Sequence, residues 1–249
     1  MTHEKLYETL KTKFLKILAD ENLLTEKIEI ISKALTPEEA IGITKRKDFP
    51  IITGKEIMIQ AECRGSKGQA FTDSPAVFKG TLAEICNMDL EKDHQAAGLF
   101  IASLNAVMKY LGKSDCTIHC KSEGPEKCAK DILTYISEKY GNPKIALVGY
   151  QPSMLENLSK EFNLRVLDLN SSNIGTVRYG VKVEDGISAY EEVVKDWADL
   201  VLCTGSTICN GTIVNFMELS KPVLFFGTTL SGAAPILGLN RLCFADRYN

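Results

Sequence analysis

The sequence predicts an α/β protein in which a smaller mixed part precedes a doubly wound parallel sheet. In the first part, segments with strand character precede two helices, an order typical of an α+β unit. From about residue 124 onward, short apolar segments alternate with amphipathic ones, as strands and crossover helices do in a parallel sheet. We place the boundary in the charged connection 113–123 and predict domains of residues 1–115 and 116–249.

The elements of the first part follow from apolar spacing and from capping residues. Thr81 and Glu84 have the capping-box spacing, and Gly112 follows a long alanine-rich stretch as a C-terminal stop. Helices are therefore expected over 4–20, 80–88 and 93–112. Strands are expected at 27–35, 40–44 and 56–63, and an extended segment is expected at 68–75.

The second part alternates regularly between the two kinds of segment. Pro125 stands at the start of a helical pattern and Gly141 at its end, which is the usual asymmetry of helix termini. Helices are expected over 124–141, 153–162, 188–198 and 211–219. Buried strands are expected at 144–149, 164–169, 200–205, 222–227 and 241–245.

Composition excludes several classes of partner. The 249 residues are 45% hydrophobic and 24% charged, with a formal net charge of −3. The sequence has no extended basic block of the kind that binds nucleic acid. The sequence contains no stretch of 18 apolar residues that would predict a membrane span. Its N-terminal segment has the pattern of a charged amphipathic helix and not that of a secretory leader. A cytoplasmic location is therefore expected. The sequence leaves a monomer and a homodimer both open.

Three loops with small polar residues, at 148–153, 203–212 and 226–235, follow predicted strands, and in a parallel sheet they open onto the same edge. Glycine lets a backbone approach a ligand closely, and helix N-termini favour oxyanions. The candidate ligand-binding residues are Gly149, Gln151, Thr204, Gly205, Ser206, Thr207, Asn210, Gly211, Thr212, Gly227, Thr228 and Thr229. The alternative is that these residues only form turns and helix caps.

A nucleoside-containing cofactor is a second interpretation. The phosphate-binding P-loop pattern is absent, and Gly149 stands alone where a dinucleotide fold has three glycines. Asp168, however, ends the next predicted strand at roughly the 20-residue spacing of a ribose-binding acid. Asp168 is therefore a candidate cofactor-binding residue.

Serine hydrolysis is not supported. Ser206 follows a strand, but its neighbours do not form the nucleophile-elbow pattern. The histidines of the chain are His3, His94 and His119, and all three precede Ser206, whereas a hydrolase of this kind places its histidine later.

The segment 115–131 holds a concentration of soft metal ligands. Cys116, His119, Cys120 and Cys128 offer three thiols and an imidazole, which suit zinc, iron or copper. Their spacing matches no standard zinc module, and none of the eight cysteines forms a C-x-x-C pair. The alternative is that these cysteines pack as small apolar residues.

Three stretches together resemble one protein family. They are "TGSTICNGTI" (204–213), "FFGTTLSGAAPILGLNRL" (225–242) and the segment 78–112. The chain resembles the DUF364 family, whose members are described as heavy-metal chelation proteins, with an N-terminal DUF4213 domain. The resemblance implies an enolase-N-terminal-like α+β domain joined to a Rossmann-like domain. It also implies a cleft between them that Thr204, Ser206 and Asn210 help to line, with Thr207 and the two glycines 205 and 211. Thr228 stands where the family pattern has proline.

Three functional hypotheses follow. The first is binding, or synthesis, of a small anionic or metal-chelating ligand in the interdomain cleft, with a heavy metal as cargo. The second is an enzyme that uses a nucleoside-containing cofactor, such as S-adenosylmethionine or a dinucleotide. The third is direct binding of a metal, such as zinc or iron, by thiolates. The sequence assigns no reaction.

Overall fold

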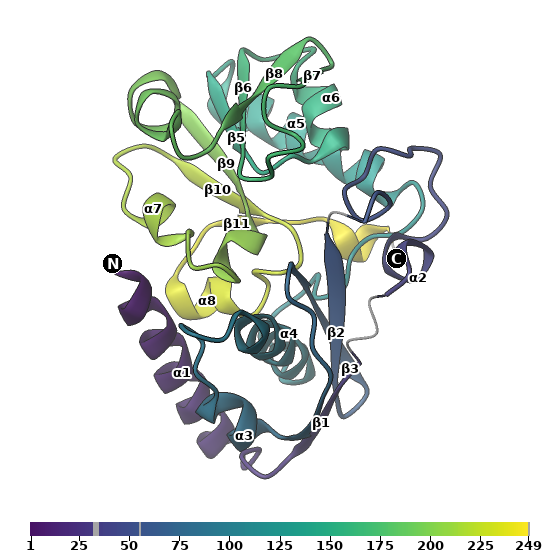
Figure 1. The fold of residues 1–249 in the computed structure, drawn as a ribbon, viewed down its shortest axis with the longest axis vertical. Helices are drawn as coiled ribbons and strands as arrows, with labels where there is room; N and C mark the ends of the chain where they lie inside the picture. Colours follow the sequence, from purple (N-terminus) through teal and green to yellow (C-terminus); the bar gives the residue numbers. More distant parts are fainter. Residues whose placement is uncertain (32–34, 55, 249) are drawn as a thin grey trace.

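The structure is a computed structural model and describes residues 1–31, 35–54 and 56–248. Within these residues the chain forms two β-sheets with helices between and around them (Figure 1). The smaller sheet belongs to the N-terminal part, residues 1–115, and the larger sheet to the C-terminal part. No helix among the described residues has both the length and the apolar character needed to cross a membrane.

The smaller sheet is antiparallel. Its strands are β1 (Lys27–Ile31), β2 (Ile57–Cys63), β3 (Ser66–Thr72) and β4 (Phe78–Thr81), in the order β3-β2-β1-β4. The helices of this part are α1 (His3–Asp20), α2 (Pro37–Ile41), α3 (Leu82–Asn87) and α4 (His94–Tyr110). The Thr81–Glu84 capping box is present, as predicted, and it begins α3 directly after β4.

The larger sheet is mostly parallel, as predicted. Its strands are β5 (Ile145–Val148), β6 (Leu164–Asp168), β7 (Val177–Arg178), β8 (Val181–Asp185), β9 (Leu200–Thr204), β10 (Val223–Phe226) and β11 (Arg241–Leu242). Their order is β11-β10-β9-β5-β6-β8-β7, and the short β7 is antiparallel to β8. The direction in which the chain adds strands reverses between β5 and β9, so a crevice is expected at the carboxyl ends of these two strands.

Helices cover both faces of the larger sheet. On one face, Leu147 and Leu202 pack in a core with α5 (Gly124–Tyr140) and α6 (Pro152–Leu158). On the other face, Cys203 and Phe225 belong to the same buried core as α1 and α4. Neighbouring residues of a strand point to opposite faces, which explains why these strands are apolar throughout.

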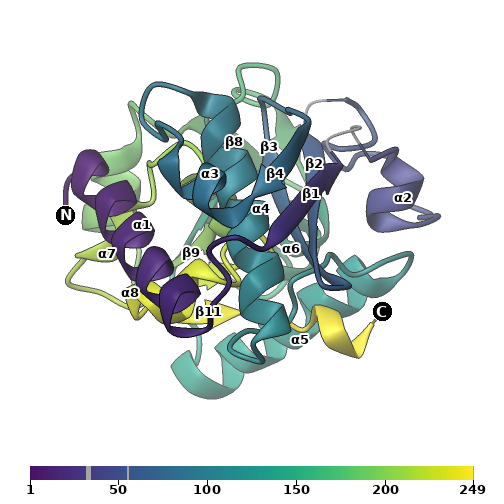
Figure 2. The same cartoon turned by 90° about the horizontal axis from the view of Figure 1, so that it is seen from below.

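Helix α4 lies between the smaller sheet and α8 (Ala233–Leu237), and the two views of the ribbon agree on this position (Figures 1 and 2). Gly68 permits the close approach of β3, since a Cβ there would lie 2.2 Å from the backbone nitrogen of Ala106 on α4. Phe100 of α4 meets Phe14 of α1 edge to face, with ring centroids 5.5 Å apart. The two parts of the chain thus share one apolar core.

The prediction of a strand at 40–44 is wrong. Residues Pro37–Ile41 form helix α2 instead, because Thr36 and Glu39 make a capping box and Pro37 occupies the first turn. The strand expected at 27–35 is confirmed over Lys27–Ile31, while residues 32–34 lie outside the described residues. The extended segment expected at 68–75 is part of a regular strand, β3.

Differences in the second part concern short elements. The helix expected over 211–219 is reduced to α7 (Val214–Met217), and a 3₁₀ turn at Gly205–Ile208 precedes it. Polar side chains of this segment hydrogen-bond nearby groups and so compete with a regular helix. The helix expected over 188–198 is a π-helix at Glu191–Trp197. Strands β4, β7 and β8 and helix α8 were not predicted, since each is short and lacks a clear period.

The side chain of Asn105 ties the two parts together. It is fully buried on α4, and its Nδ2 donates to the carbonyls of Gln69 at 2.9 Å and Thr229 at 2.9 Å. Its Oδ1 accepts from the backbone N–H of Gly232 at 2.7 Å. One amide group therefore forms the hydrogen bonds that buried backbone groups of β3 and of the loop between β10 and α8 need, because these groups cannot bond to water.

We expect Asn105→Ala to lower the free energy of unfolding by about 3 kcal/mol or more, because several buried backbone groups lose their partner. Urea denaturation measures this change. The matched control is Asn157→Ala on α6, whose half-buried amide donates to the carbonyl of Ser153 and whose loss costs about 1 kcal/mol. Equal losses in the two variants would contradict the bridging role of Asn105.

Candidate functional site

A cavity of about 790 Å³ opens at the carboxyl ends of β5, β6, β9 and β10. All three predicted loops line it, at 148–152, 204–212 and 226–229. Phe49, Glu56 and Phe71 contribute from the N-terminal part, so the cavity lies between the two parts of the chain. Its size suits a small organic molecule.

Most of the candidate ligand-binding residues border this cavity. The exceptions are Gly205 and Gly211, which have packing roles instead. A Cβ at Gly205 would lie 2.6 Å from the Cβ of Leu230, and one at Gly211 would lie 1.5 Å from Nε2 of His3. The candidates that line the cavity are Gly149, Gln151, Thr204, Ser206, Thr207, Asn210, Thr212, Gly227, Thr228 and Thr229.

Internal hydrogen bonds shape the loop after β9. Oγ1 of Thr207 donates to the carbonyl of Thr204 at 2.7 Å, and the hydroxyls of Thr204 and Ser206 lie 2.9 Å apart. The Oδ1 of Asn210 accepts from both the N–H and the hydroxyl of Thr212, at 3.1 and 2.7 Å. The loop is therefore pre-formed, and each hydroxyl retains lone pairs for a further contact.

Helix α1 holds the same loop from the N-terminal part. The hydroxyl of Tyr7 donates to the carbonyl of Ile208 at 2.8 Å and also lies 3.2 Å from that of Cys209. Burial is the main reason why the pKa of Tyr7 is raised well above its usual range, so the hydroxyl remains a donor. The imidazole of His3 also packs against Gly211. These two contacts hold the loop against α1.

The loop after β10 contains two buried hydroxyls with no hydrogen-bond partner, those of Thr228 and Ser231, and only Thr228 belongs to the cavity lining. Thr228 is 2% exposed, and its Oγ1 is buried and makes no hydrogen bond. Its neighbour Thr229 differs, because its hydroxyl accepts from the N–H of Phe71 on β3 at 3.1 Å. A buried polar atom without a partner is costly, so the hydroxyl of Thr228 is a group in the cavity lining that would gain from a new partner.

Asp168, the candidate ribose-binding residue, lines the cavity but already has several partners. Its carboxylate accepts from the backbone N–H groups of Tyr150 at 3.0 Å and Asn170 at 2.7 Å. The amide of Asn173 donates to it at 3.2 Å. These contacts show that Asp168 shapes the loops that follow β5 and β6.

Glu56, just before β2, is a functional candidate that the sequence did not reveal. It faces the cavity from the N-terminal part, and burial, followed by the negative charge of Asp168, raises its pKa to about 7. Perturbed carboxyls of this kind cluster at functional sites. A single glutamate before a strand carries no motif, so only the fold places it opposite Asp168.

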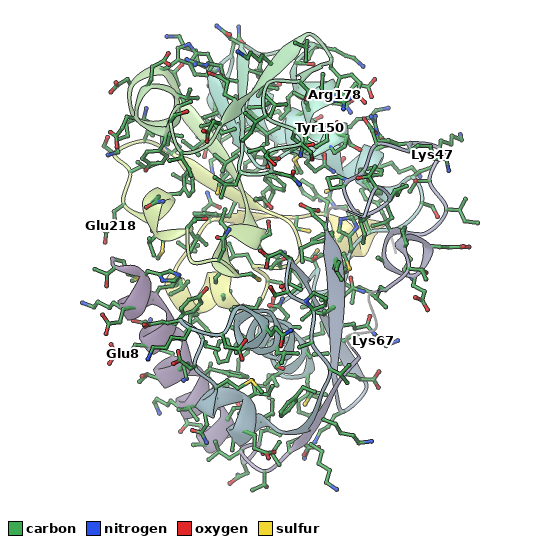
Figure 3. All side chains as sticks on the ribbon, in the orientation of Figure 1. Glu8, Lys47, Lys67, Tyr150, Arg178 and Glu218 are labelled. Carbon is green, nitrogen blue, oxygen red and sulfur yellow. The ribbon has the colours of Figure 1, made fainter. Side chains whose placement is uncertain are left out.

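The loop 44–51 forms another wall of the cavity, through Phe49, Pro50 and Ile51. Arg46 fastens this loop by pairing with Glu126 of α5 at 2.5 Å and with Glu156 of α6. Asp48 of the same loop accepts from the hydroxyls of Tyr179 at 2.8 Å and Tyr150 at 3.4 Å. Figure 3 shows Lys47 on this loop at the edge of the molecule, beside the half that carries Tyr150 and Arg178.

The charged groups of the lining are mainly acidic. Lys195 also lines the cavity but pairs with Glu191 at 2.9 Å. Burial lowers the pKa of His119, which is therefore neutral at physiological pH. The lining carboxyls of the described residues are Glu56, Asp168, Glu191 and Glu218. Glu191 is neutralised by Lys195, and Glu218 pairs with the N-terminal amine at 2.8 Å. Glu56 and Asp168 therefore remain as the carboxyls that favour a ligand with positive charge.

The predicted metal ligands are brought partly together. His119, Cys120 and Cys128 line the cavity along with Cys243, whereas Cys116 lies behind it with its thiol 3.5 Å from the carbonyl of Cys243. No group of three or more histidine, cysteine, aspartate or glutamate side chains within the described ranges is arranged to hold a metal ion. All eight cysteines are free.

Hydrogen bonding and burial determine which atoms of His119 and the neighbouring cysteines hold a proton. Nδ1 of His119 lies 2.7 Å from the carbonyl of Cys120, an acceptor, so the proton is on Nδ1 and Nε2 has the lone pair. The Cys120 thiol acts as a donor to Cys128 and lowers the pKa of Cys128, while this interaction and burial raise the pKa of Cys120. The interaction with Cys243 is the main cause that lowers the pKa of Cys116 to about 7.

Comparison with known proteins identifies the central segment of the C-terminal part. Residues 131–237 match the DUF364 family. This family is described as "Putative heavy-metal chelation". The DUF364 segment includes β5 to β10 and the three loops of the cavity. No curated protein matches the sequence.

Two solved structures of DUF364 proteins of unknown function are similar in fold. One, from Pyrococcus horikoshii, has a TM-score of 0.52 and 14% sequence identity, over 90% of this chain and 79% of that chain. The other, from Desulfitobacterium hafniense DCB-2, has a TM-score of 0.51 and 13% identity, over 73% of this chain and 72% of that chain. At these identities the likeness extends to the fold alone.

Replacing either of the two threonines after β10 by valine should change the free energy of unfolding differently. Thr228→Val removes a buried hydroxyl without a partner, so the free energy of unfolding should stay the same or rise by up to about 1 kcal/mol. Thr229→Val leaves the N–H of Phe71 unpaired and should lower the free energy of unfolding by about 1 kcal/mol. Urea denaturation of both variants compares them directly. A loss in Thr228→Val as large as in Thr229→Val would show that the Thr228 hydroxyl has a partner.

The raised pKa of Glu56 should make the stability of the protein depend on pH. Its pKa is about 7 in the folded protein and about 4.5 in a model peptide, so the folded state binds the extra proton between these values. This carboxyl therefore makes the protein less stable as the pH rises from about 4.5 to about 7. Glu56→Gln removes that loss and should be more stable than the wild type at about pH 8, with the difference shrinking towards pH 4.5.

Thermal unfolding over this pH range measures the effect. Glu62→Gln, which changes an exposed carboxyl on β2, is the matched control and should follow the wild-type curve. A Glu56→Gln curve parallel to that of the wild type at all pH values would contradict a raised pKa.

Proposed function

We propose that the cavity binds a small molecule between the N-terminal and C-terminal parts, and that this molecule is a heavy-metal chelate. The observation that carries the proposal is Thr228, a residue of the cavity lining whose buried hydroxyl has no hydrogen-bond partner. The pre-formed loops at 148–152 and 204–212 supply further hydroxyls and amides on the same wall. Binding sites usually combine an apolar cavity with a few such convergent polar groups.

The charge of the lining favours a metal chelate over a simple anion. Glu56 and Asp168 approach the ligand space from opposite parts of the chain, and Lys195 is already paired. A chelate presents oxygen or nitrogen atoms to the hydroxyl loops and brings the positive charge of its metal. The description of the DUF364 family supports the same ligand class.

The architecture proposed for the chain is a Rossmann-like domain of residues 116–249 preceded by an enolase-N-terminal-like, DUF4213-like domain of residues 1–115. Support for the former comes from the strand order, in which β8-β6-β5-β9-β10-β11 follows the 3-2-1-4-5-6 pattern of dinucleotide-binding folds. The antiparallel sheet and helices of the N-terminal part support the latter. The free cysteines support a reducing, cytoplasmic location.

The same strand order supports a second candidate, a nucleoside-containing cofactor above β5 and β6. Asp168 would then bind the ribose. Its carboxylate already accepts from Tyr150, Asn170 and Asn173, which leaves it less capacity for two ribose hydroxyls. The metal chelate is therefore the preferred ligand.

Thermal unfolding with a ligand panel tests the proposal. The panel holds Zn²⁺ and Ni²⁺, the chelator histidine, the histidine complexes of both metals, adenosine, S-adenosylmethionine and NAD. A chelate present at 100 times its dissociation constant stabilises the folded state by about 2.7 kcal/mol, which corresponds to a midpoint rise of roughly 5–10 °C. We expect such a rise with the complexes, and a smaller one with the metals or histidine alone.

Thr228→Val and Ser206→Ala should reduce the rise because each removes a hydroxyl from a residue of the cavity lining. Thr9→Ala on α1, which removes a hydroxyl that donates to the carbonyl of Lys5 and does not line the cavity, is the matched control. A rise with adenosine, S-adenosylmethionine or NAD alone would replace the chelate proposal with the cofactor alternative.

A further inference from the structure

We propose that Cys120 and Cys128 form a two-coordinate thiolate site for a monovalent thiophilic cation, represented by Cu⁺, on one wall of the cavity. The proposal concerns the bare ion and two protein sulfurs, so it does not depend on the chelate proposal above. Soft sulfur ligands select Cu⁺ over the divalent ions that prefer oxygen. Two sulfurs suffice for this ion, and the site therefore needs no third protein ligand.

The helix geometry places the two thiols side by side. Cys120 lies against the first turn of α5, where its Cβ is 2.8 Å from the position that a Cβ would take on Gly124. Cys128 is one turn further along α5, on the same helix face as Gly124. Side chains on a helix lean towards its N-terminus, so the thiol of Cys128 points back towards Cys120. Both cysteines line the same cavity.

Both thiols can be reached from the cavity. Cys120 is 5% exposed and Cys128 is 7% exposed, and both belong to the cavity lining. Their environment is otherwise apolar, with Ile132 of α5 and Met154 of α6 in the same core. An ion that enters the cavity meets the pair without passing through the packed interior.

The charges of the site balance. Two thiols lose two protons to water and form two metal–sulfur bonds with one monovalent ion, which leaves one net negative charge and changes no oxidation state. The N-terminal turns of the 17-residue helix α5 supply partial positive charge at this place. Packing of cysteines as small apolar residues is the alternative, and it predicts no ion binding.

Anaerobic titration of the full chain with Cu⁺ against the chromophoric chelator bicinchoninate tests the proposal. We expect the wild-type protein to remove one equivalent of Cu⁺ from the chelator. Cys120→Ser and Cys128→Ser should each weaken this binding by about 100-fold or more, since even a change beside a metal ligand costs 10–100-fold. The control is Cys209→Ser, which changes a half-buried cysteine on another loop and should bind as the wild type does.

Two further variants separate the geometry from the thiol count. Gly124→Ala keeps both cysteines but displaces Cys120, because the new Cβ would lie 2.8 Å from that of Cys120, and it should weaken binding. Cys243→Ser removes a third thiol of the cavity and should leave binding unchanged. Circular dichroism and thermal unfolding establish that each variant is folded.

Failure of the wild-type protein to remove Cu⁺ from the chelator would overturn the proposal, and so would wild-type affinity in Cys120→Ser or Cys128→Ser. A loss in Cys243→Ser as large as in Cys120→Ser would overturn the two-coordinate assignment. Thr228→Val should retain full Cu⁺ binding, so a failure of the thiol site and a failure of the chelate proposal give different results.

Discussion

The buried amide of Asn105 joins three segments that are far apart in the sequence. It sits on α4, donates to the carbonyl of Gln69 on β3, and both donates to and accepts from the loop 228–232. Because these backbone groups are buried, the alternative to this amide is an unpaired donor or acceptor. Together with the shared apolar core, this side chain holds the smaller sheet in position relative to the larger one, on which the width of the cavity depends.

The cavity has walls of different chemistry because each wall comes from a different element. Hydroxyls and amides come from the loops after β5, β9 and β10, while the thiols come from the start of α5. Glu56 comes from the smaller sheet and meets Asp168 across the space. Arg46 closes the remaining side by fixing its loop to α5 and α6. A ligand that fills the cavity therefore contacts both parts of the chain at once.

Sequence patterns predicted the long elements and the loops of the site. The helix 93–112 and the strand 56–63 have strong periods, and they are present as α4 and β2. The parallel order of the large sheet also follows from alternation in the sequence. The polar loops were recognised because they follow buried strands, and the structure brings them to one cavity.

Other features depend on tertiary contacts that a sequence does not show. The residues 40–44 look like a strand, but the capping box at Thr36 makes the preceding residues a helix. Glu56 has no motif and gains its raised pKa only by burial opposite Asp168. Gly211 was interpreted as a ligand-binding residue, whereas its lack of a side chain makes room for His3.

The contact between α1 and the loop after β9 has a consequence for the order of folding. Tyr7 bonds the carbonyl of Ile208, and Lys13 donates to the carbonyl of Ile236 at 2.9 Å, so α1 finds these partners about 200 residues later in the chain. During synthesis, an N-terminal segment is exposed before its distant partners exist. The Tyr7 and Lys13 bonds therefore form only after residues 208–236 have left the ribosome, whereas Phe14 finds its partner Phe100 earlier in the chain. The contacts of α1 with the segments after β9 and β10 are therefore among the most distant in sequence that the fold has to complete.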